Sequence, residues 1–464
     1  MILNINNNFT EIEATKAEKS WLESFLVTSF TEFRRHGSEL VPVSVPKSFL
    51  TNKGILTGLV PEVRKRAEDD EVDVIIKDWR KIPGVPREVP ETLGNIDLRD
   101  YQINAAQTLI QATRGVVDLP PASGKSEIMI AAIRAVEKAG SVCVLVNRDE
   151  LLRKEWIPRL KSRGVPEHKI GEIKAGTWKP KKITVAMLQT LHRRLTQQPT
   201  RDYLNSVTTW VIDEVHLAGA QSYADVGLLM NNAYWRWGVS ANTLDYGKAR
   251  NFQMIGLTGG QVFFKPLKEM VDAMYISDII YHTPIVPMLN VEDKHYGMDF
   301  ESLQQEFIYN NPYHRSLIRT VTNYHNKERI LIFVNRLDHG RYLREGIPDA
   351  EFAFATGMSR DRRNNIIDAF YEGELRVLIA SPIADYGLDF QELPVVINAG
   401  GLKSPHQFIQ RMGRGMRLKA GNKPMHYYDP RFDGVPMLDD HSQERLRIML
   451  KHYPEVKVVT TICR

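Results

Sequence analysis

The chain has 464 residues, of which 43% are hydrophobic and 25% are charged, and its 61 basic and 56 acidic residues give a formal net charge of +5. This length accommodates about two to four domains, each with its own core. No apolar run approaches the roughly 18 residues that cross a membrane, and the first residues lack the pattern of a secretory signal. Cys143 and Cys463 make neither a disulfide framework nor a metal site. We therefore expect a soluble, cytoplasmic protein whose charge permits nucleic-acid binding without demonstrating it.

The first 90 residues differ in pattern from the rest of the chain. An amphipathic helical stretch, an extended stretch, a helix that begins with proline and another strand are predicted at Lys16–Arg34, Leu40–Val45, Pro61–Glu68 and Val72–Lys77. The proline-rich stretch Pro83–Pro90 then predicts a linker. We expect residues 1–90 to form a separate small α+β domain that binds DNA or assists the rest of the chain.

A phosphate-binding loop is predicted between a strand and a helix. Gly115–Leu119 has the pattern of a buried strand, Ile128–Ile133 has that of the apolar side of a helix, and Leu119–Ser126 reads Leu-Pro-Pro-Ala-Ser-Gly-Lys-Ser. In such a loop, backbone N–H groups cradle the phosphates, Lys125 reaches the β and γ oxygens, and the Ser126 hydroxyl ligates Mg²⁺. Gly-Lys-Ser also opens ordinary helices, but the strand-loop-helix setting favours the binding loop.

The loop departs from the usual G-x-x-x-x-G-K-S pattern at its start. Leu119 stands where glycine is expected, and Pro120 and Pro121 have no N–H group to donate. The cradle is therefore expected from the residues that follow, which are Ala122, Ser123, Gly124, Lys125 and Ser126.

An acidic motif completes the predicted nucleotide site. Val211-Ile212-Asp213-Glu214-Val215-His216 ends an apolar strand pattern with two carboxylates. Asp213 is expected to share the metal ion with Ser126, and Glu214 to align or deprotonate the attacking water. Together with Lys125, these residues predict an enzyme that hydrolyses ATP with Mg²⁺.

Strand-like apolar runs alternate with helical stretches from Leu98 onward, which favours parallel sheets built from β-α-β units. The rhythm occurs twice, on either side of a region near residues 284–312 that contains Pro284, Pro287 and a helix-like segment, Met298–Ile308. Two α/β lobes are the simplest account. The predicted strands are Val142–Val146, Ile183–Leu188, Trp210–Ile212, Ile330–Val334, Val377–Ala380 and Val395–Ile397.

Basic residues gather at positions 179–182, 360–363 and 411–419, and each cluster by itself is typical of a solvated face. Within Gln407–Arg417, Arg414 and Arg417 lie three positions apart and would share a face if the segment is helical. Next to a phosphate loop, such a pair is suited to stabilise charge that develops on a γ-phosphoryl group.

The order of these motifs resembles that of superfamily 2 helicases of the DExH type, over about Asp97 to Pro430. Val211–His216 resembles motif II, Gln407–Arg417 resembles motif VI, and Leu98–Gln102 resembles the segment that reads adenine ahead of the phosphate loop. The resemblance implies two RecA-like parallel-sheet lobes, at residues 91–285 and 286–464, after the N-terminal domain.

The resemblance also implies roles for individual residues. Adenine would be read by Arg99 and Gln102, and Gly387 and Asp389 of a motif V-like segment would lie at the nucleotide. Coupling of the nucleotide to the rest of the site would fall to His216 and Gln410, and Arg414 and Arg417 would be arginine fingers. The nucleic-acid backbone would be held by Asn147, Arg148, Gln189, Thr190, Asn335, Arg336, Thr356 and Gly357.

Two motifs depart from the family pattern. Motif III is usually Ser-Ala-Thr, whereas this chain has Ser240-Ala241-Asn242, which alters the element that links hydrolysis to strand movement; Thr243 is a candidate substitute. Motif V begins with Ser381 in place of the more usual threonine, which keeps the hydroxyl group.

The start at Leu98–Gln102, the Gly256–Gly260 step and the N-terminal segments resemble the UvsW-like branch-migration helicases of tailed phages, which are similar to the XPB and RecG groups. This resemblance implies a DNA helicase or translocase that remodels forks and Holliday junctions in replication, recombination or repair, in the host cytoplasm if the chain is of phage origin. Forked, branched or single-stranded DNA would be the partner, and no membrane is expected. An RNA helicase of the same superfamily and an ATP-regulated nucleic-acid clamp with little motor activity stay open as alternatives.

Overall fold

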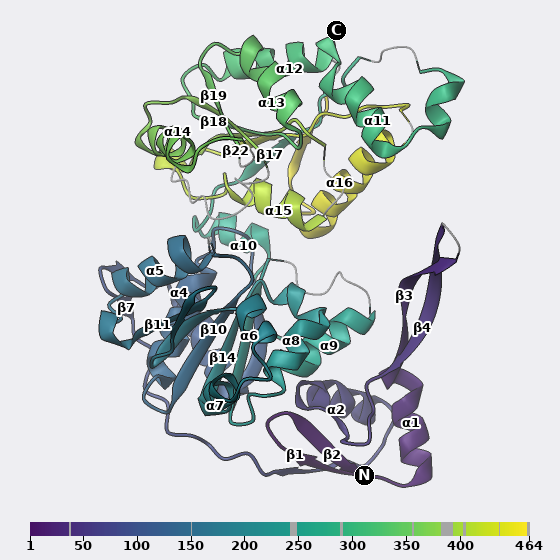
Figure 1. Ribbon diagram of the computed structural model, residues 1–464, viewed down its shortest axis with the longest axis vertical. Helices are drawn as coiled ribbons and strands as arrows, with labels where there is room; N and C mark the ends of the chain where they lie inside the picture. Colours follow the sequence, from purple (N-terminus) through teal and green to yellow (C-terminus); the bar gives the residue numbers. More distant parts are fainter. Residues whose placement is uncertain are drawn as a thin grey trace. The chain divides into compact units, whose positions relative to one another are not determined.

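The computed structural model describes residues 1–36, 39–149, 151–241, 248–287, 291–354, 357–381, 393–401, 405–435 and 437–461. Contacts divide the chain into two units: Met1–Leu119 with Gly124–Phe264, and Lys265–Arg464 with Pro120–Ser123. Each unit contains one large sheet (Figure 1). Within these described ranges, the helices are too short or too polar to cross a membrane.

The first unit is organised around an eight-stranded sheet in the order β12-β11-β13-β10-β14-β15-β9-β16, and every neighbouring pair is parallel except β11 and β12. Its central strands are almost wholly buried because helices flank the sheet (Figure 1). The strands are β9 (Arg114–Asp118), β10 (Ser141–Val146), β11 (Ile170–Lys174), β12 (Thr177–Lys179), β13 (Ile183–Met187), β14 (Val207–Asp213), β15 (Trp235–Ser240) and β16 (Gln261–Phe264). The helical elements are α3 (Asp100–Ala112), α4 (Lys125–Val136), η2 (Leu151–Trp156), α5 (Ile157–Ser162), η3 (Glu167–Lys169), α6 (Leu188–Arg193), α7 (Gln198–Ser206), η4 (Val215–Gly219), α8 (Gln221–Gly227) and α9 (Lys248–Thr258).

The second unit has a seven-stranded sheet in the order β19-β20-β18-β21-β22-β17-β23, with all neighbouring pairs parallel. The strands are β17 (Ile279–His282), β18 (Ile330–Phe333), β19 (Ala350–Ala353), β20 (Val377–Ala380), β21 (Val395–Asn398), β22 (Met425–Tyr428) and β23 (Lys457–Val459). The helical elements are α10 (Leu267–Asp272), η5 (Asp293–Gly297), α11 (Phe300–Gln304), η6 (Gln305–Tyr309), α12 (Pro312–Tyr324), α13 (Leu337–Gly346), α14 (Arg360–Glu372), α15 (Pro405–Gly413), η8 (Ala420–Asn422) and α16 (Leu438–His452).

The N-terminal residues form a four-stranded sheet in the order β5-β2-β1-β6, and apolar residues of two helices share its core. Thr15 caps the first of these helices, since its hydroxyl accepts a hydrogen bond from the Glu18 backbone N–H at 3.3 Å. The elements are β1 (Ile2–Ile5), β2 (Phe9–Glu13), α1 (Lys16–Leu26), β5 (Ile55–Leu56), η1 (Thr57–Leu59), α2 (Val60–Asp69) and β6 (Ile75–Asp78), followed by a short ribbon of β7 (Thr92–Leu93) and β8 (Ile96–Asp97).

A long β-hairpin leaves this domain between α1 and β5. Within the described part of the chain, its strands, β3 (Val27–His36) and β4 (Glu39–Ser48), pair only with each other, and Figure 1 shows them extending away from the rest of the domain. None of the hairpin side chains that the structure describes is buried. The hairpin therefore contributes little to the core of the domain.

Helix α9 of the first lobe anchors the N-terminal domain. Ala249, Phe252 and Ile255 of α9 pack into the apolar core of the domain. The approach is closest at Gly58, where a Cβ atom would lie 1.9 Å from the Ile255 carbonyl oxygen. Only glycine fits at that position.

Two buried arginines fix the turn between β1 and β2 to the sheet of the first lobe. Arg114 of β9 donates to the Asn7 backbone carbonyl, and Arg236 of β15 donates to the Asn8 side-chain oxygen. The Asn8 amide donates in turn to the Leu228 carbonyl at 2.8 Å. Loss of either arginine bond would leave a buried guanidinium group with one hydrogen-bond partner fewer, which is costly.

The predicted fold class is confirmed: two RecA-like α/β lobes follow a small N-terminal α+β domain. Two predicted limits are wrong. The helix expected over Lys16–Arg34 ends at Leu26, where β-branched Val27 and Thr28 begin β3. The lobe boundary expected between residues 285 and 286 falls too late, because β17 (Ile279–His282) pairs with β22 and β23 of the second sheet.

Replacing Gly58 by alanine is expected to destabilise the first unit, because the added methyl group meets the Ile255 carbonyl. Overpacking of this kind costs about 1–3 kcal/mol. Thermal unfolding measures the loss, and Gly260→Ala is the matched control, since a Cβ at Gly260 meets no atom within 4 Å. Equal melting temperatures for the two variants would contradict the close packing of the domain on α9.

Candidate functional site

Three neighbouring parallel strands end at one edge of the first sheet. In the register of the sheet, Asp118 of β9 lies beside Ser240 of β15, and Val239 lies beside Asp213 of β14. Loops that follow the carboxyl ends of parallel strands meet at the same edge. The predicted phosphate loop, the acidic motif and Ser240 are thereby brought together from distant parts of the sequence.

The loop between β9 and α4 has the backbone of a phosphate cradle. Ala122 and Gly124 both have positive φ angles, of 63° and 74°, and α4 begins at Lys125. A residue other than glycine at positive φ marks strain of the kind found at functional sites, and the first N–H groups of a helix are available to an anion. The Lys125 ammonium donates to the Leu119 carbonyl at 2.9 Å. This bond uses backbone atoms of Leu119, so the leucine side chain in place of glycine does not remove it.

Gln102 lies against the phosphate loop. It is buried in the first turn of α3, where its side-chain oxygen accepts a hydrogen bond from the Arg99 backbone N–H at 3.0 Å. A Cβ at Gly124 would lie 2.3 Å from the Gln102 amide nitrogen. Gly124 is therefore required twice, for its positive φ and for the approach of Gln102. The structure thus brings Arg99 and Gln102, the predicted adenine readers, next to the loop.

Asp213 and Glu214 place two carboxylates near the Lys125 ammonium. Burial, and then repulsion from Glu214, raise the pKa of Asp213 to about 7. Burial lowers the pKa of Lys125, whereas the nearby carboxylates of Glu214, Asp118 and Asp213 oppose that shift. Glu214 itself has a left-handed backbone, with φ of 54°, which is uncommon for a residue other than glycine.

This arrangement suits a divalent cation. The Ser126 hydroxyl and the Asp213 carboxylate are hard oxygen ligands of the kind that Mg²⁺ takes. Burial and, after it, repulsion from Glu214 raise the pKa of Asp213, and a cation there would offset both effects. Across the described ranges, no three His, Cys, Asp or Glu side chains surround a metal position. Phosphate oxygens and waters would therefore supply the remaining ligands, as is usual for Mg²⁺.

Trp156 holds the Asp213 carboxylate. Its indole N–H donates to Asp213 Oδ2 at 2.8 Å, and its ring is buried. Trp156 ends η2, a π-helix that begins shortly after Asn147 and Arg148. Turns of π-helix are frequently found at functional sites. The sequence analysis missed Trp156, for which the single available signal is that a buried indole N–H needs a partner.

His216 connects the acidic motif to the end of β15. Its Nδ1 atom lies 3.1 Å from Ser240 Oγ and 3.3 Å from Glu214 Oε2, and the ring is buried. The predicted coupling residue therefore touches Ser240, the first residue of the motif III-like segment. Asn242 and Thr243 of that segment lie outside the described residues.

Two of the segments predicted to hold a nucleic-acid backbone meet at the same edge of the sheet. Asn147 follows β10, Gln189 lies in α6 after β13, and the Gln189 amide donates to the Asn147 carbonyl at 2.8 Å. Gln189 is exposed, and Asn147 and Arg148 are half-buried. Thr190 is buried, so its side chain turns into the protein, away from any strand bound at this edge.

In the second unit, Asn335 belongs to a buried polar network. Its side-chain oxygen accepts a hydrogen bond from Arg411 at 3.1 Å. Arg411 also donates to Asn398 at 3.1 Å, and Asn398 donates to Asp429 at 2.9 Å. Arg411 is fully buried. It therefore serves the interior of this lobe, unlike the two arginines that follow it in the sequence.

Arg414 and Arg417 do not lie on a helix. Helix α15 ends at Gly413, and Arg417 forms a β-bridge with Ile276. The two arginines were predicted to share a face only if their segment is helical, and it is not. Both side chains are partly exposed.

The remaining predicted residues of this lobe are placed separately. Arg336 precedes α13 and forms an exposed ion pair with Glu301 at 2.5 Å. Gly357 has a φ of 85°. Thr356, Gly387 and Asp389 lie outside the described residues, as does the side chain of Gln410.

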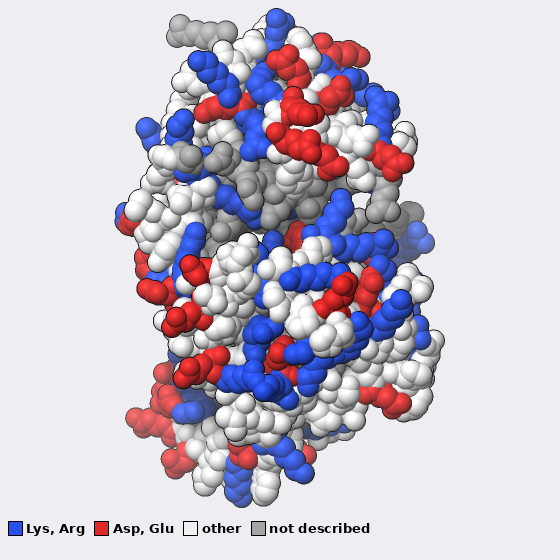
Figure 2. All heavy atoms as spheres, turned by 90° about the vertical axis from the view of Figure 1, so that its left-hand side faces the viewer, with Lys and Arg blue, Asp and Glu red and all other residues white. Residues whose placement is uncertain are grey.

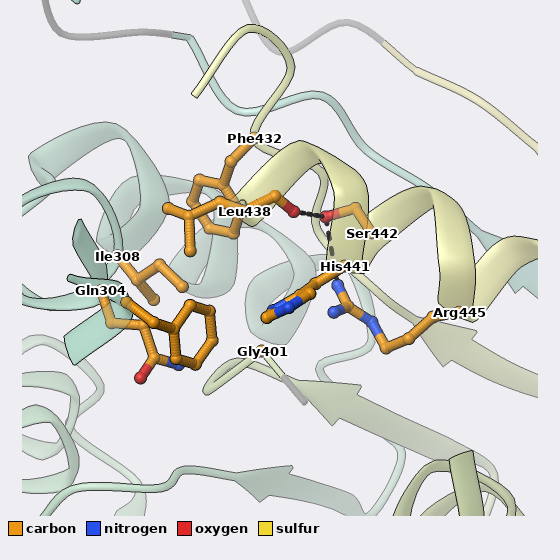
Figure 3. Close-up of a pocket in the computed structure, with 9 residues that line it drawn as sticks. Gln304, Ile308, Gly401, Phe432, Leu438, His441, Ser442 and Arg445 are labelled. Carbon is orange, nitrogen blue, oxygen red and sulfur yellow. Dashed lines mark hydrogen bonds between the residues drawn. The ribbon is translucent and has the colours of Figure 1, made fainter. Parts of the chain in front are cut away.

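A small pocket in the second unit lies beside Gly401 and is lined by four apolar side chains, Phe300, Ile308, Phe432 and Leu438, and by four polar ones, Gln304, His441, Ser442 and Arg445 (Figure 3). Its polar groups are engaged: Arg445 donates to Asp429 at 2.7 Å, and the Ser442 hydroxyl donates to the Leu438 carbonyl at 2.8 Å. The charge of Arg445 is thus already paired, and the pocket does not have the character of a phosphate site.

A phosphate loop and a two-carboxylate motif on nearby parallel strands, together with a second parallel-sheet lobe, define a two-lobed nucleoside triphosphatase. Two family models match the chain: "Type III restriction enzyme, res subunit" over residues 95–244 and "Helicase conserved C-terminal domain" over residues 313–419. Together they span more than half of the chain. The chain belongs to superfamily 2 of the helicases, in the DExH group, and hydrolyses ATP, as the order of its motifs predicts.

The chain is also similar to individual proteins and solved structures. The DNA 3'-5' translocase XPB2 of Sulfurisphaera tokodaii is 26% identical over 396 residues, which cover 77% of this chain and 86% of that protein. A fragment of a putative HsdR subunit of a type I restriction enzyme from Vibrio vulnificus shares the fold, with a TM-score of 0.58 at 15% identity over 96% of this chain and 95% of its own. T4 UvsW aligns over 100% of this chain and 99% of its own, at 16% identity and a TM-score of 0.46.

Replacing Trp156 by phenylalanine is expected to raise the Mg²⁺ concentration needed for half-maximal ATPase by about 10- to 100-fold, the usual effect of losing a hydrogen bond to a metal ligand. The substitution keeps a ring and removes the N–H group that holds Asp213. Trp237→Phe is the matched control, because it removes a buried indole bond to the Leu109 carbonyl. An equal Mg²⁺ shift in both variants would show that Trp156 acts through general stability alone.

Proposed function

We propose that the chain is an ATP-driven DNA translocase that remodels branched DNA such as forks and Holliday-type junctions. The observation that carries the proposal is the meeting of two groups at the carboxyl edge of one sheet: the ATP-site residues Lys125 and Asp213, and the Asn147–Gln189 pair. Because the strands that lead into both groups belong to one sheet, a displacement at the nucleotide can be transmitted to the residues expected to bind nucleic acid. The name of the Sulfurisphaera tokodaii relative, a DNA translocase, favours DNA over RNA.

In the proposed mechanism, the first lobe binds the triphosphate. The backbone N–H groups of Ala122–Ser126 and the Lys125 ammonium hold the phosphates. Ser126 and Asp213 would hold Mg²⁺, which neutralises phosphate charge when bound. Glu214 orients the attacking water, and Arg414 and Arg417 of the second lobe stabilise charge on the γ-phosphoryl group.

Trp156 and His216 link this chemistry to the grip on nucleic acid. Trp156 holds Asp213 from the end of η2, which the chain enters directly after the Asn147–Arg148 segment. A displacement of that segment therefore reaches a predicted metal ligand through one short element. On the other side of Asp213, the contact between His216 and Ser240 couples the nucleotide site to the motif III-like segment. In that segment Asn242 stands where the family usually has threonine.

The grip is expected to recognise the sugar-phosphate backbone, which every strand presents alike. Binding should therefore be largely independent of base sequence and sensitive to salt. Discrimination between a branch and a plain duplex needs a further contact.

We assign branch selection to residues 1–90 and, within them, to the β3–β4 hairpin. An isolated hairpin is only marginally stable in water, and this one buries none of its described side chains. Its length is therefore better explained by contact with a partner than by folding. The base of the hairpin is fixed to α9, since Lys47 donates to Gln253 and the ring of Phe49 packs edge-on against Phe252, with 5.5 Å between ring centres.

Lys125→Ala is expected to abolish ATP turnover, because it removes the cation that contacts the β and γ phosphates. Glu214→Gln is expected to stop hydrolysis and leave ATP binding largely intact, since the amide cannot accept a proton from water. Nucleic-acid-stimulated ATPase and equilibrium nucleotide binding separate the two effects. Turnover near that of the wild type in either variant would refute the assignment.

Arg414→Ala and Arg417→Ala are each expected to lower kcat by about 10³-fold or more with a much smaller effect on the KM for ATP, as for other arginine fingers. Arg411→Ala is the control, and its expected effect is a lower melting temperature, because Asn335 and Asn398 lose a buried partner. Steady-state kinetics decide the point. A loss confined to KM would assign the two arginines to ground-state binding.

Shortening the hairpin tests branch selection without unfolding the domain. Thr31 and Ser44 are partners in the hairpin register, so joining them through an Asn-Gly turn removes the tip and keeps the anchored base. We expect the variant to hydrolyse ATP on single-stranded DNA and to lose its preference for forked DNA. Truncation before Glu91 is a poorer test, because it exposes the apolar surface of α9. A shortened hairpin with intact fork preference would disprove the assignment.

The proposed function as a whole is tested with a panel of forked DNA, Holliday-type DNA and RNA duplexes at matched salt. Stronger ATPase stimulation and unwinding on RNA would establish the RNA helicase alternative. ATP hydrolysis and binding with no strand separation or fork regression would establish the clamp.

A further inference from the structure

Positive charge is concentrated in one segment of the first lobe. Leu151–Lys182 contains ten lysine and arginine residues and three acidic residues, a net charge of +7, whereas the whole chain carries +5. The remainder of the chain is therefore slightly acidic. Figure 2 shows the side on which α5 and β11 lie in Figure 1, and lysine and arginine side chains gather there.

Five lysines of this segment form what we call the basic edge, because they lie at the amino ends of the parallel strands. Lys161 is in the last turn of α5, Lys169 precedes β11, and Lys179, Lys181 and Lys182 lead from β12 into β13.

The basic edge lies opposite the predicted strand grip. Asn147 and Gln189 follow the carboxyl ends of β10 and β13, whereas Lys182 directly precedes the amino end of β13. A strand of five residues separates its two ends by about 17 Å. The basic edge is therefore a second surface and not an extension of the first.

Acidic neighbours neutralise only part of the basic edge. Lys161 forms an ion pair with Glu167, while Lys181 donates to the Glu167 backbone carbonyl at 3.2 Å. Lys169 pairs with Glu137 at 3.1 Å. For the side-chain ammonium groups of the other two lysines, Lys179 and Lys182, the described part of the chain supplies no hydrogen bond or ion pair.

The surroundings of the basic edge suit duplex rather than single-stranded nucleic acid. Proteins that bind single strands offer aromatic rings on which bases stack. Trp178, next to Lys179, is not available in this way, because the Arg194 guanidinium lies 4.4 Å from its ring centre and Tyr203 packs against it edge-on. What is left is a set of flexible ammonium groups, which attract phosphates without reading bases.

We propose that the basic edge binds the phosphate backbone of duplex DNA, namely the double-stranded arm of the branched substrate. The inference rests on the proposed function and adds a second DNA contact to it. Duplex DNA carries one negative charge per about 1.7 Å of its axis and is stiff over roughly 150 base pairs. An arm that leaves the branch along the side of the lobe therefore reaches a surface about 17 Å from the strand grip without bending.

The test replaces Lys179, Lys181 and Lys182 together by glutamine, which keeps most of each side chain and removes its charge. The control makes the same change of charge at Lys327, Lys423 and Lys457, three exposed lysines of the second lobe. Affinities for single-stranded DNA and for the same strand with a duplex arm are measured by fluorescence anisotropy at several salt concentrations. Thermal unfolding confirms that both triple variants are folded, and Lys161→Gln with Lys179→Gln serves as a second, milder variant.

We expect the basic-edge variant to lose on the order of tenfold in the ratio of duplex-arm to single-strand affinity, and its salt dependence on the armed substrate to fall by about two to three in log–log slope. The control variant should keep the wild-type ratio. An unchanged ratio in the basic-edge variant, or equal losses on both substrates, overturns this inference while the proposed function stands. Loss on an RNA duplex arm but not on a DNA arm also overturns it. A wild-type protein with no preference for branched DNA overturns the proposed function together with the inference.

Discussion

The site depends on one electrostatic constraint, the placing of two adjacent carboxylates, Asp213 and Glu214, opposite the Lys125 ammonium. Burial of the Asp213 carboxylate and then its repulsion from Glu214 are both unfavourable to its charged form, and both raise its pKa. The fold maintains the arrangement because β14 and β9 flank β15 in register, and because Trp156 donates a hydrogen bond to Asp213. A ligand that brings phosphates and a cation relieves the repulsion, which gives the site a physical reason to respond to what it binds.

Helix α9 extends this constraint to the N-terminal domain. It packs against η4, the turn that carries His216, and its other side joins the core of the domain. Two glycines mark these contacts, because a Cβ at Gly219 would lie 2.9 Å from Arg250 and one at Gly58 would lie 1.9 Å from Ile255. Close-packed interiors transmit displacements. The domain is thus part of the first lobe mechanically, although its sequence pattern sets it apart.

Short local patterns accounted for the parts of the fold that the sequence analysis predicted, such as the buried strand of Val142–Val146 and the loop before Lys125. What escaped prediction depends on partners far away in the chain. The bond from Trp156 to Asp213 spans 57 positions. Arg114 is buried, against the usual surface preference of arginine, because Asn7 returns to meet it from a different domain. A short stretch of sequence, of the length that predicts a helix or strand, does not contain both members of either pair.

The carboxyl ends and the amino ends of the strands in a parallel sheet are chemically different, and the first lobe places a different kind of group at each. Loops at the carboxyl ends present oriented backbone and paired charges, whereas the amino ends of β11 and β13 present lysines. Strand β13 joins the two sets directly, with Lys182 before it and Gln189 just after it. In the proposed function, the contacts with the single strand and with the duplex arm lie at the two ends of β13. A fully paired strand in the middle of a buried sheet is stiff, since bending it would break hydrogen bonds to both of its neighbours.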